Sequence, residues 1–168
     1  MSSSSGAVAG GIAVGVAFVV AFSMFSIPSG FKGNIENVTI SLERTACFGF
    51  CPDYAVTVFG NGTVAYDGHN FVKVVGKHST QIPQSDVKEL VNEFYKVGFF
   101  SMNDRYEQQV TDLPSQTTSI TIDGNTTKSV YRYGTEPRGL VMLEDKIDEV
   151  AKNRAVGKII IREEKSPS

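Results

Sequence analysis

The sequence has little cysteine and no cluster of basic residues. The lack of a basic cluster argues against one class of partner, nucleic acid. Its 168 residues carry a formal net charge of −2, and the basic side chains are scattered over residues 32–165 without forming a stripe. A protein that binds nucleic acid neutralises phosphates with clustered lysine and arginine. Nucleic acid is therefore not expected as a partner.

The signatures of common enzyme sites are also missing. The chain has no glycine-rich loop of the kind that cradles phosphates and no nucleophile elbow. Asp104, Glu107 and Asp112 flank a long stretch without periodicity, and loops on a rigid scaffold often carry function. These three carboxylates are candidate site residues, although such spacing is also ordinary for a solvated loop. The sequence predicts no catalytic residue and no cofactor.

The N-terminal part of the chain differs in composition from the rest. Residues 6–27 contain no charged side chain, and a helix of that length would extend about 33 Å, enough to cross a bilayer core of about 30 Å. A cleaved signal peptide is the alternative, with a small-x-small triplet at residues 21–23. However, residues 1–5 lack the basic charge of such peptides. The sequence predicts a retained transmembrane anchor over residues 1–28, followed by a linker over residues 29–34.

One face of the predicted anchor carries small side chains at every fourth position: Ala9, Ala13, Ala17 and Ala21. Small residues at this spacing let two membrane helices approach closely. The stripe therefore predicts a helix partner, either an integral membrane protein or a second copy of this chain. The alternative is that membrane helices are simply rich in alanine and glycine.

Residues 35–153 are predicted to form one α+β domain, followed by a tail over residues 154–168. Alternation of apolar side chains predicts strands over residues 35–43, 54–59, 63–66, 69–75, 116–122 and 128–133. Helical spacing predicts helices over residues 83–97 and 137–152. This order, ββββ-α-ββ-α, predicts a mainly antiparallel sheet with two helices packed on one face. The charges Glu144, Asp145, Asp148 and Glu149 are interpreted as the solvated face of the second helix.

The stretch between Cys47 and Tyr54, Cys-Phe-Gly-Phe-Cys-Pro-Asp-Tyr, is the most distinctive in the chain. Glycine at position 49 permits a tight turn, which would bring the two cysteine Cα atoms within the ~4.4–6.8 Å that a disulfide requires. Closing so short a loop would fix its local shape rather than add much global stability. The spacing therefore favours a structural disulfide between Cys47 and Cys51.

The cysteine pair has two alternative uses, in redox chemistry and in metal binding. Reactive thiols usually lie two residues apart at a helix N-terminus, whereas this pair is separated by three residues and is followed by a predicted strand. His69 and His78 would complete a four-ligand metal set, but they bracket one predicted strand, which would hold them about 30 Å apart. No metal ligand is predicted, and a thiol-redox or metal-handling role remains the alternative to a structural one.

Four motifs link the domain to a known type of protein: the cysteine block, the turn at Asn61 and Gly62, Tyr66-x-Gly68, and Asp112-x-Pro114. With these motifs, residues 40–150 resemble a family of small exported domains of unknown function. The resemblance implies an exported or membrane-anchored module, with the soluble domain on the extracytoplasmic side of the cell membrane. It implies no catalytic residue. We therefore expect a non-catalytic binding or scaffolding module, acting as an accessory subunit of a membrane protein complex.

Overall fold

Alternation of apolar and polar side chains builds a sheet with two different faces. The computed structural model describes residues 31–151. In the central strand β1, Val38, Ile40 and Leu42 are buried, while Thr39 and Ser41 lie on the opposite face. Neighbouring strands repeat this pattern in register, so that Leu42 lies opposite Val56 on one side and Thr118 on the other. The apolar face packs against the helices and forms the core.

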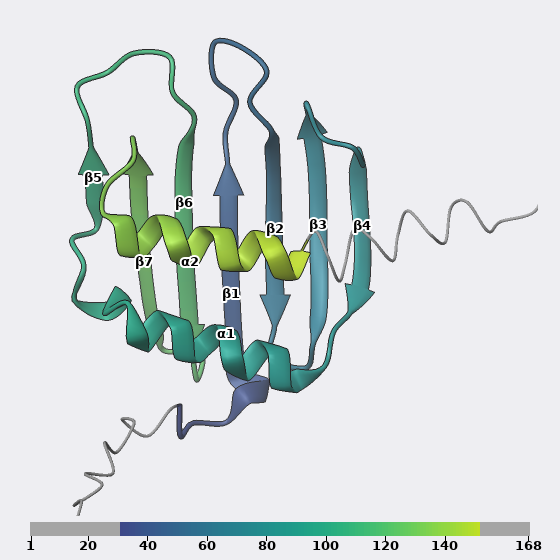
Figure 1. Ribbon diagram of the computed structural model, residues 1–168. Helices are drawn as coiled ribbons and strands as arrows, with labels where there is room; N and C mark the ends of the chain where they lie inside the picture. The colour runs from purple at the N-terminus through teal and green to yellow at the C-terminus, as the bar shows by residue number, and fades with distance from the viewer. Residues whose placement is uncertain (1–30, 152–168) are drawn as a thin grey trace, which may run out of the picture.

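Seven strands form one sheet in the order β4-β3-β2-β1-β6-β7-β5, and every pair is antiparallel except β5 with β7 (Figure 1). The strands are β1 (Val38–Arg44), β2 (Asp53–Phe59), β3 (Thr63–Asn70), β4 (Gly76–Gln81), β5 (Arg105–Glu107), β6 (Ser115–Ile122) and β7 (Thr126–Tyr133). Short 3-10 helices, η1 (Ile35–Asn37) and η2 (Phe99–Ser101), precede β1 and follow the first α-helix.

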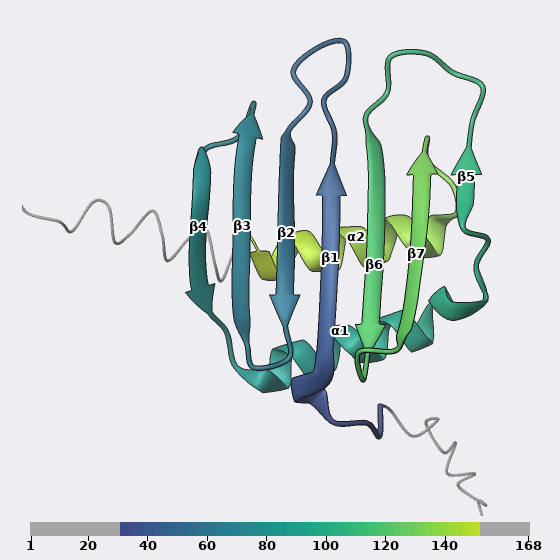
Figure 2. The same ribbon diagram turned by 180° about the vertical axis from the view of Figure 1, so that it is seen from behind.

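Two α-helices, α1 (Gln84–Lys96) and α2 (Arg138–Glu149), lie across the same face of the sheet. No helix within residues 31–151 covers the opposite face, as Figure 2 shows. Each helix follows a proline, whose fixed φ suits a helix start, and Gly98 ends the α1 region with φ of +70°. The α+β class, the mainly antiparallel sheet and the helices on one face agree with the sequence prediction.

The fourth strand does not run over residues 69–75, where alternation predicts it. β3 continues to Asn70, the chain turns over residues 71–75, and β4 begins at Gly76. Glycine is needed at position 68 for close packing rather than for a turn, because a Cβ there would lie 2.1 Å from the carbonyl oxygen of Val74. His69 and His78 therefore belong to two adjacent antiparallel strands, and not to one.

The stretch over residues 99–115, expected to be a loop, also contains η2 and the short strand β5, which pairs in parallel with β7. A strand of three residues, of which only Tyr106 is partly buried, is too short to show a periodicity from which it could be identified in the sequence. Among residues 31–151, no helix is long and apolar enough to cross a membrane. The predicted anchor over residues 1–28, with the stripe Ala9, Ala13, Ala17 and Ala21, lies outside the described residues, as does the predicted tail over residues 154–168.

The two ends of the sheet differ in what they carry. At the upper end in Figure 1 lie the β1–β2 loop, the β3–β4 loop and the segment that joins β5 to β6. At the lower end lie η1, the β2–β3 turn and the β6–β7 turn. The inner face of the sheet is apolar towards the lower end and becomes polar and charged towards the upper end, where the candidate site is found.

Candidate functional site

A buried ion pair between β7 and α2 lies at the centre of the polar region. The Nε of Arg132 donates to both carboxylate oxygens of Glu144, at 3.0 and 3.1 Å, and its Nη2 also contacts this carboxylate. Arg132 also donates to the carbonyl oxygen of Gly134. Glu144 is 0% exposed, and Thr118 of β6 donates to it at 3.5 Å. The sheet and α2 are thus joined by a bidentate ion pair inside the protein.

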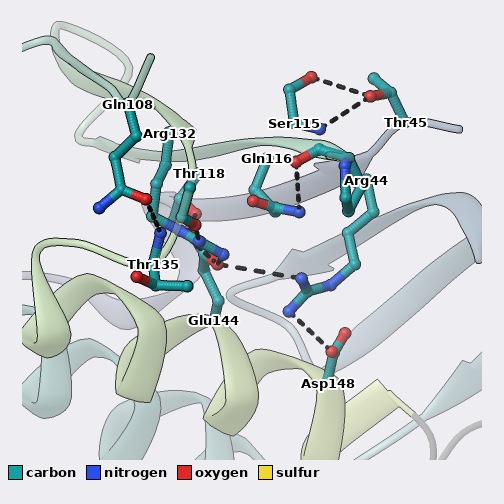
Figure 3. Close-up of polar contacts among 12 residues, drawn as sticks. Arg44, Thr45, Gln108, Ser115, Gln116, Thr118, Arg132, Thr135, Glu144 and Asp148 are labelled. Atoms are coloured by element: carbon teal, nitrogen blue, oxygen red, sulfur yellow. Dashed lines mark hydrogen bonds and ion pairs between the residues drawn. The ribbon is translucent and has the colours of Figure 1, made fainter. Parts of the chain in front are cut away.

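A second arginine extends this pair across the sheet. Arg44, the last residue of β1, contacts Asp148 of α2 at 2.9 Å and approaches Glu144 at 3.9 Å. Figure 3 shows Glu144 lying between Arg132 and Arg44. The hydroxyl of Tyr54, near the start of β2, donates to the other oxygen of Asp148. We call these five residues, Arg44, Tyr54, Arg132, Glu144 and Asp148, the ionic network.

The charges of the ionic network balance, with two guanidinium groups facing two carboxylates. Burial would lower the pKa of Arg44, but attraction to the carboxylates of Asp148 and Glu144 outweighs burial and raises it. Burial raises the pKa of Tyr54, and the hydrogen bond to Asp148 raises it further. Tyr54 therefore stays a neutral hydrogen-bond donor at physiological pH. Both shifts favour the protonation states that hold the network together.

Two of the four acidic residues of α2 do not lie on the solvated face that was predicted for them. Asp145 and Glu149 are exposed as expected, but Glu144 and Asp148 are buried against the sheet. They follow Leu140 at steps of four, beside Leu143 and Ile147, and so lie on the inward side of the helix. The spacing of their arginine partners also indicates burial. Arg44 and Arg132 stand two residues after the buried Leu42 and Val130, and therefore lie on the same face of their strands. Charged residues at inward positions on three elements indicate a buried network.

The ionic network holds the base of the loop over residues 45–52, which we call the disulfide loop. Arg44 directly precedes this loop and Tyr54 follows it by two residues, and both contact Asp148. On the β6 side, the backbone N–H of Thr45 donates to the Ser115 carbonyl at 3.0 Å, and their hydroxyls lie 2.8 Å apart. Side chains of α2 and β6 therefore fix both ends of the loop.

Within this loop the structure brings Cys47 and Cys51 to disulfide-bonding distance, with their Cα atoms 5.5 Å apart. Gly49 has no positive φ, and a Cβ added there would meet only the Cys47 sulfur at an ordinary 3.7 Å. The turn therefore does not require glycine, contrary to the argument from sequence. The disulfide, rather than glycine, constrains the loop.

The disulfide loop presents exposed aromatic side chains at the upper end of the domain. Phe48 and Phe50 are 91% and 89% exposed. Phe71, in the β3–β4 loop, packs edge-on against Phe50 with ring centroids 5.3 Å apart. Phe71 has a φ of +55°, a left-handed conformation that is uncommon and costly for a bulky residue. We call Phe48, Phe50 and Phe71 the aromatic tip.

A histidine flanked by two aspartates lies beside the aromatic tip. Nδ1 of His69, in β3, lies 3.0 Å from Asp53 at the start of β2, and its Nε2 lies 3.7 Å from Asp67. The hydrogen bond to Asp53 raises the pKa of His69, with further attraction from both carboxylates. This ion pair connects the strand that follows the disulfide loop to the strand that leads into Phe71.

The acidic candidates from the sequence do not gather into one site. Asp104 pairs with Lys128, Glu107 accepts from Arg105 at 2.8 Å, and Asp112 is exposed with a φ of +65°. Within residues 31–151, no group of three or more histidine, cysteine or acidic side chains is placed to hold a metal ion. The residues that the structure does bring together are those of the ionic network and the aromatic tip.

Replacing Glu144 with Leu should strongly destabilise the protein, by about 3–5 kcal/mol, because Arg132 would be left buried without its carboxylate. Adding Arg132→Met should restore part of this loss, since the remaining pair of Arg44 and Asp148 is balanced in charge. Urea unfolding of the parent, both single variants and the double variant measures the coupling energy.

The matched control for this cycle is the exposed ion pair of Lys146 and Glu149 on the same helix. Replacing that pair with Met and Leu should leave unfolding almost unchanged. Additive losses from Glu144→Leu and Arg132→Met would contradict the coupling described for the network.

The ion pair of His69 should make the base of the aromatic tip sensitive to pH. Its folded pKa is raised, so its stabilising effect is complete below the unfolded value of about 6.5 and is lost as pH rises through the folded pKa. In an NMR titration of the ring protons, we expect the midpoint of His69 to lie above 6.5 and to fall in the Asp53→Asn variant. A midpoint that Asp53→Asn does not move would show that this contact is not formed in solution.

A comparison with known protein families matches the same domain that the structure defines. Residues 38–151 match the model of a domain of unknown function, DUF6438. Comparison with curated proteins finds no similar sequence. The matched range runs from the first residue of β1 to just beyond the end of α2, and it contains the whole ionic network and the aromatic tip. The chain belongs to the DUF6438 family of domains of unknown function.

Proposed function

We propose that this protein is a membrane-anchored, non-catalytic binding module, and that the aromatic tip is the surface with which it holds a partner protein. The domain would stand on the extracytoplasmic side of the cell membrane and act as an accessory subunit of a membrane protein complex. The single observation that carries this proposal is the exposure of Phe48 and Phe50 on a loop that is closed by a disulfide and held at its base by buried ion pairs.

The aromatic tip exposes a large apolar area for a small domain. Its three phenylalanines present on the order of 500 Å². The largest apolar patch on a soluble monomer is typically of this size, and it is often functional. Aromatic side chains of this kind serve as anchors that fill pockets of a partner.

The way in which the tip is held also favours binding. A loop that is ordered before it meets its partner loses less conformational entropy when the complex forms. Here the disulfide, the contacts of Arg44 and Tyr54 with Asp148, and the edge-on packing of Phe50 on Phe71 all order the tip. The unfavourable backbone conformation of Phe71 adds to this argument, since strain of that kind is concentrated at functional sites.

The anchor would add a second contact with the complex. Residues 6–27 are uncharged and long enough to cross a bilayer. The stripe of Ala9, Ala13, Ala17 and Ala21 would pack on a helix of an integral membrane protein or on a second copy of this chain. Two contacts on one tethered chain raise the overall affinity well above that of either alone.

The alternative, a thiol-redox role, fits the geometry less well. The cysteine pair lies between the end of β1 and the start of β2, and neither α1 nor α2, the α-helices of residues 31–151, begins at this loop, where its N-terminus could lower a thiol pKa. Residues 48–50, between the two cysteines, carry no positive charge that would stabilise a thiolate. This local sequence favours a disulfide that maintains loop shape over one that exchanges during catalysis.

Photo-crosslinking in native membranes tests the tip as a contact surface. A photoreactive amino acid at position 48 or 50 should give one discrete protein adduct. The same amino acid at position 142, an exposed apolar position on α2, should not give this adduct. Equal labelling from all three positions would show that the tip has no specific partner.

Affinity for the crosslinked partner then tests the role of the two side chains. Replacing Phe48 and Phe50 with Ser should leave folding intact, because both side chains are exposed, and should weaken binding by about tenfold or more. Met142→Ser is the matched control and should have no effect. Unchanged binding by the double variant would contradict the proposed role of the tip.

A further inference from the structure

The lower end of the domain carries a second apolar surface, far from the aromatic tip. It surrounds an open hollow lined by Tyr95, Gly98, Phe100, Ser101 and Ile122. Tyr95 is 49% exposed, and its ring lies 4.9 Å from Phe100 and 6.4 Å from Phe31. We call Phe31, Tyr95, Phe100 and Ile122 the underside.

The chain enters the domain at the underside. The backbone N–H of Phe31 donates to the side-chain oxygen of Asn92 in α1 at 2.9 Å, and the Phe31 ring packs against the core. Only residues 28–30 separate Phe31 from residue 27, the last residue of the predicted membrane span. Four residue steps can extend over at most about 14 Å. An anchor over residues 6–27 would therefore hold the underside within about 14 Å of the bilayer.

We propose that the underside rests on the surface of the membrane to which the chain is anchored, with the ring of Tyr95 at the level of the lipid headgroups. This inference rests on the membrane anchoring in the proposed function. Aromatic side chains favour the interface between lipid and water, where an apolar ring meets a polar layer. A contact that would be weak for a free protein is sufficient here, because the short tether keeps its local concentration high.

The charges near the underside indicate whether its contact with the membrane is electrostatic or apolar. Lys32 and Lys88 lie at this end, with Lys88 on the same side of α1 as Tyr95, two helical turns earlier. Glu36 in η1 and Asp123 in the β6–β7 turn offset them. The contact therefore depends on apolar side chains, and it should change little between neutral and anionic lipids.

A domain held in this way would point its aromatic tip away from the bilayer. The tip and the underside lie at opposite ends of the strands, and the seven residues of β1 alone extend about 23 Å. The partner that binds Phe48 and Phe50 would then be met well outside the headgroup layer. This geometry suits a neighbouring extracytoplasmic domain, and it excludes a tip inserted into the same bilayer.

Fluorescence quenching in vesicles tests this orientation. The full chain, with its disulfide intact, is reconstituted into phosphatidylcholine vesicles that contain headgroup nitroxide lipid and no other protein. A fluorophore is attached through Lys88→Cys or, in a second sample, through Phe48→Cys. We expect clear quenching from position 88 and little from position 48. Tyr95→Glu should lower the quenching at position 88 by about twofold or more, because a carboxylate is driven out of the interface.

The control is Met142→Glu, which places the same charge on an exposed apolar position of α2 and should not change the quenching at position 88. Equal quenching from positions 88 and 48 in carbonate-resistant protein would overturn the underside contact and leave the anchor standing. Quenching at position 88 that Tyr95→Glu does not lower would overturn it too. Extraction of the protein by carbonate would overturn the anchor, and the inference with it.

Discussion

The ion pairs between α2 and the sheet are the constraint on which the upper half of the domain depends. Buried charges are costly unless each has a partner, and here two arginines on β1 and β7 are matched by Glu144 and Asp148 on one helix. Because these contacts have fixed geometry, they set where α2 lies across the strands. Through Arg44 and Tyr54, they also set where the disulfide loop begins and ends.

The contacts that stabilise the domain and the surface proposed to bind a partner therefore lie in different parts of it. Its lower half is held by ordinary apolar packing between the inner face of the sheet and the two helices. Its upper half combines charge pairs with a smaller buried cluster of Tyr54, Tyr66 and Val74, and it leaves three aromatic rings exposed. An apolar core under the disulfide loop would not specify the position of that loop as sharply, because apolar contacts are less directional than bidentate ion pairs.

Local patterns predicted most of the fold, and long-range pairing explains what they missed. Alternation identified β1, β2, β6 and β7, and helical spacing identified both helices. Alternation misplaced β4, because the close approach of the Val74 carbonyl to Gly68 cannot be seen before the strands are paired. Glu144 and Asp148 looked like a solvated face for the same reason. Their burial follows only once Arg44 and Arg132 are placed on the inner face of the sheet.

The most direct test of this account is amide hydrogen exchange at Thr45, whose N–H donates to Ser115 at the base of the disulfide loop. Asp148→Asn weakens the contacts of Arg44 and Tyr54, whereas Asp145→Asn makes the same chemical change on the exposed side of the helix. The account predicts exchange at Thr45 faster by about tenfold or more in Asp148→Asn, with no change in Asp145→Asn. Equal exchange at Thr45 in both variants would contradict the claim that the ionic network holds the loop.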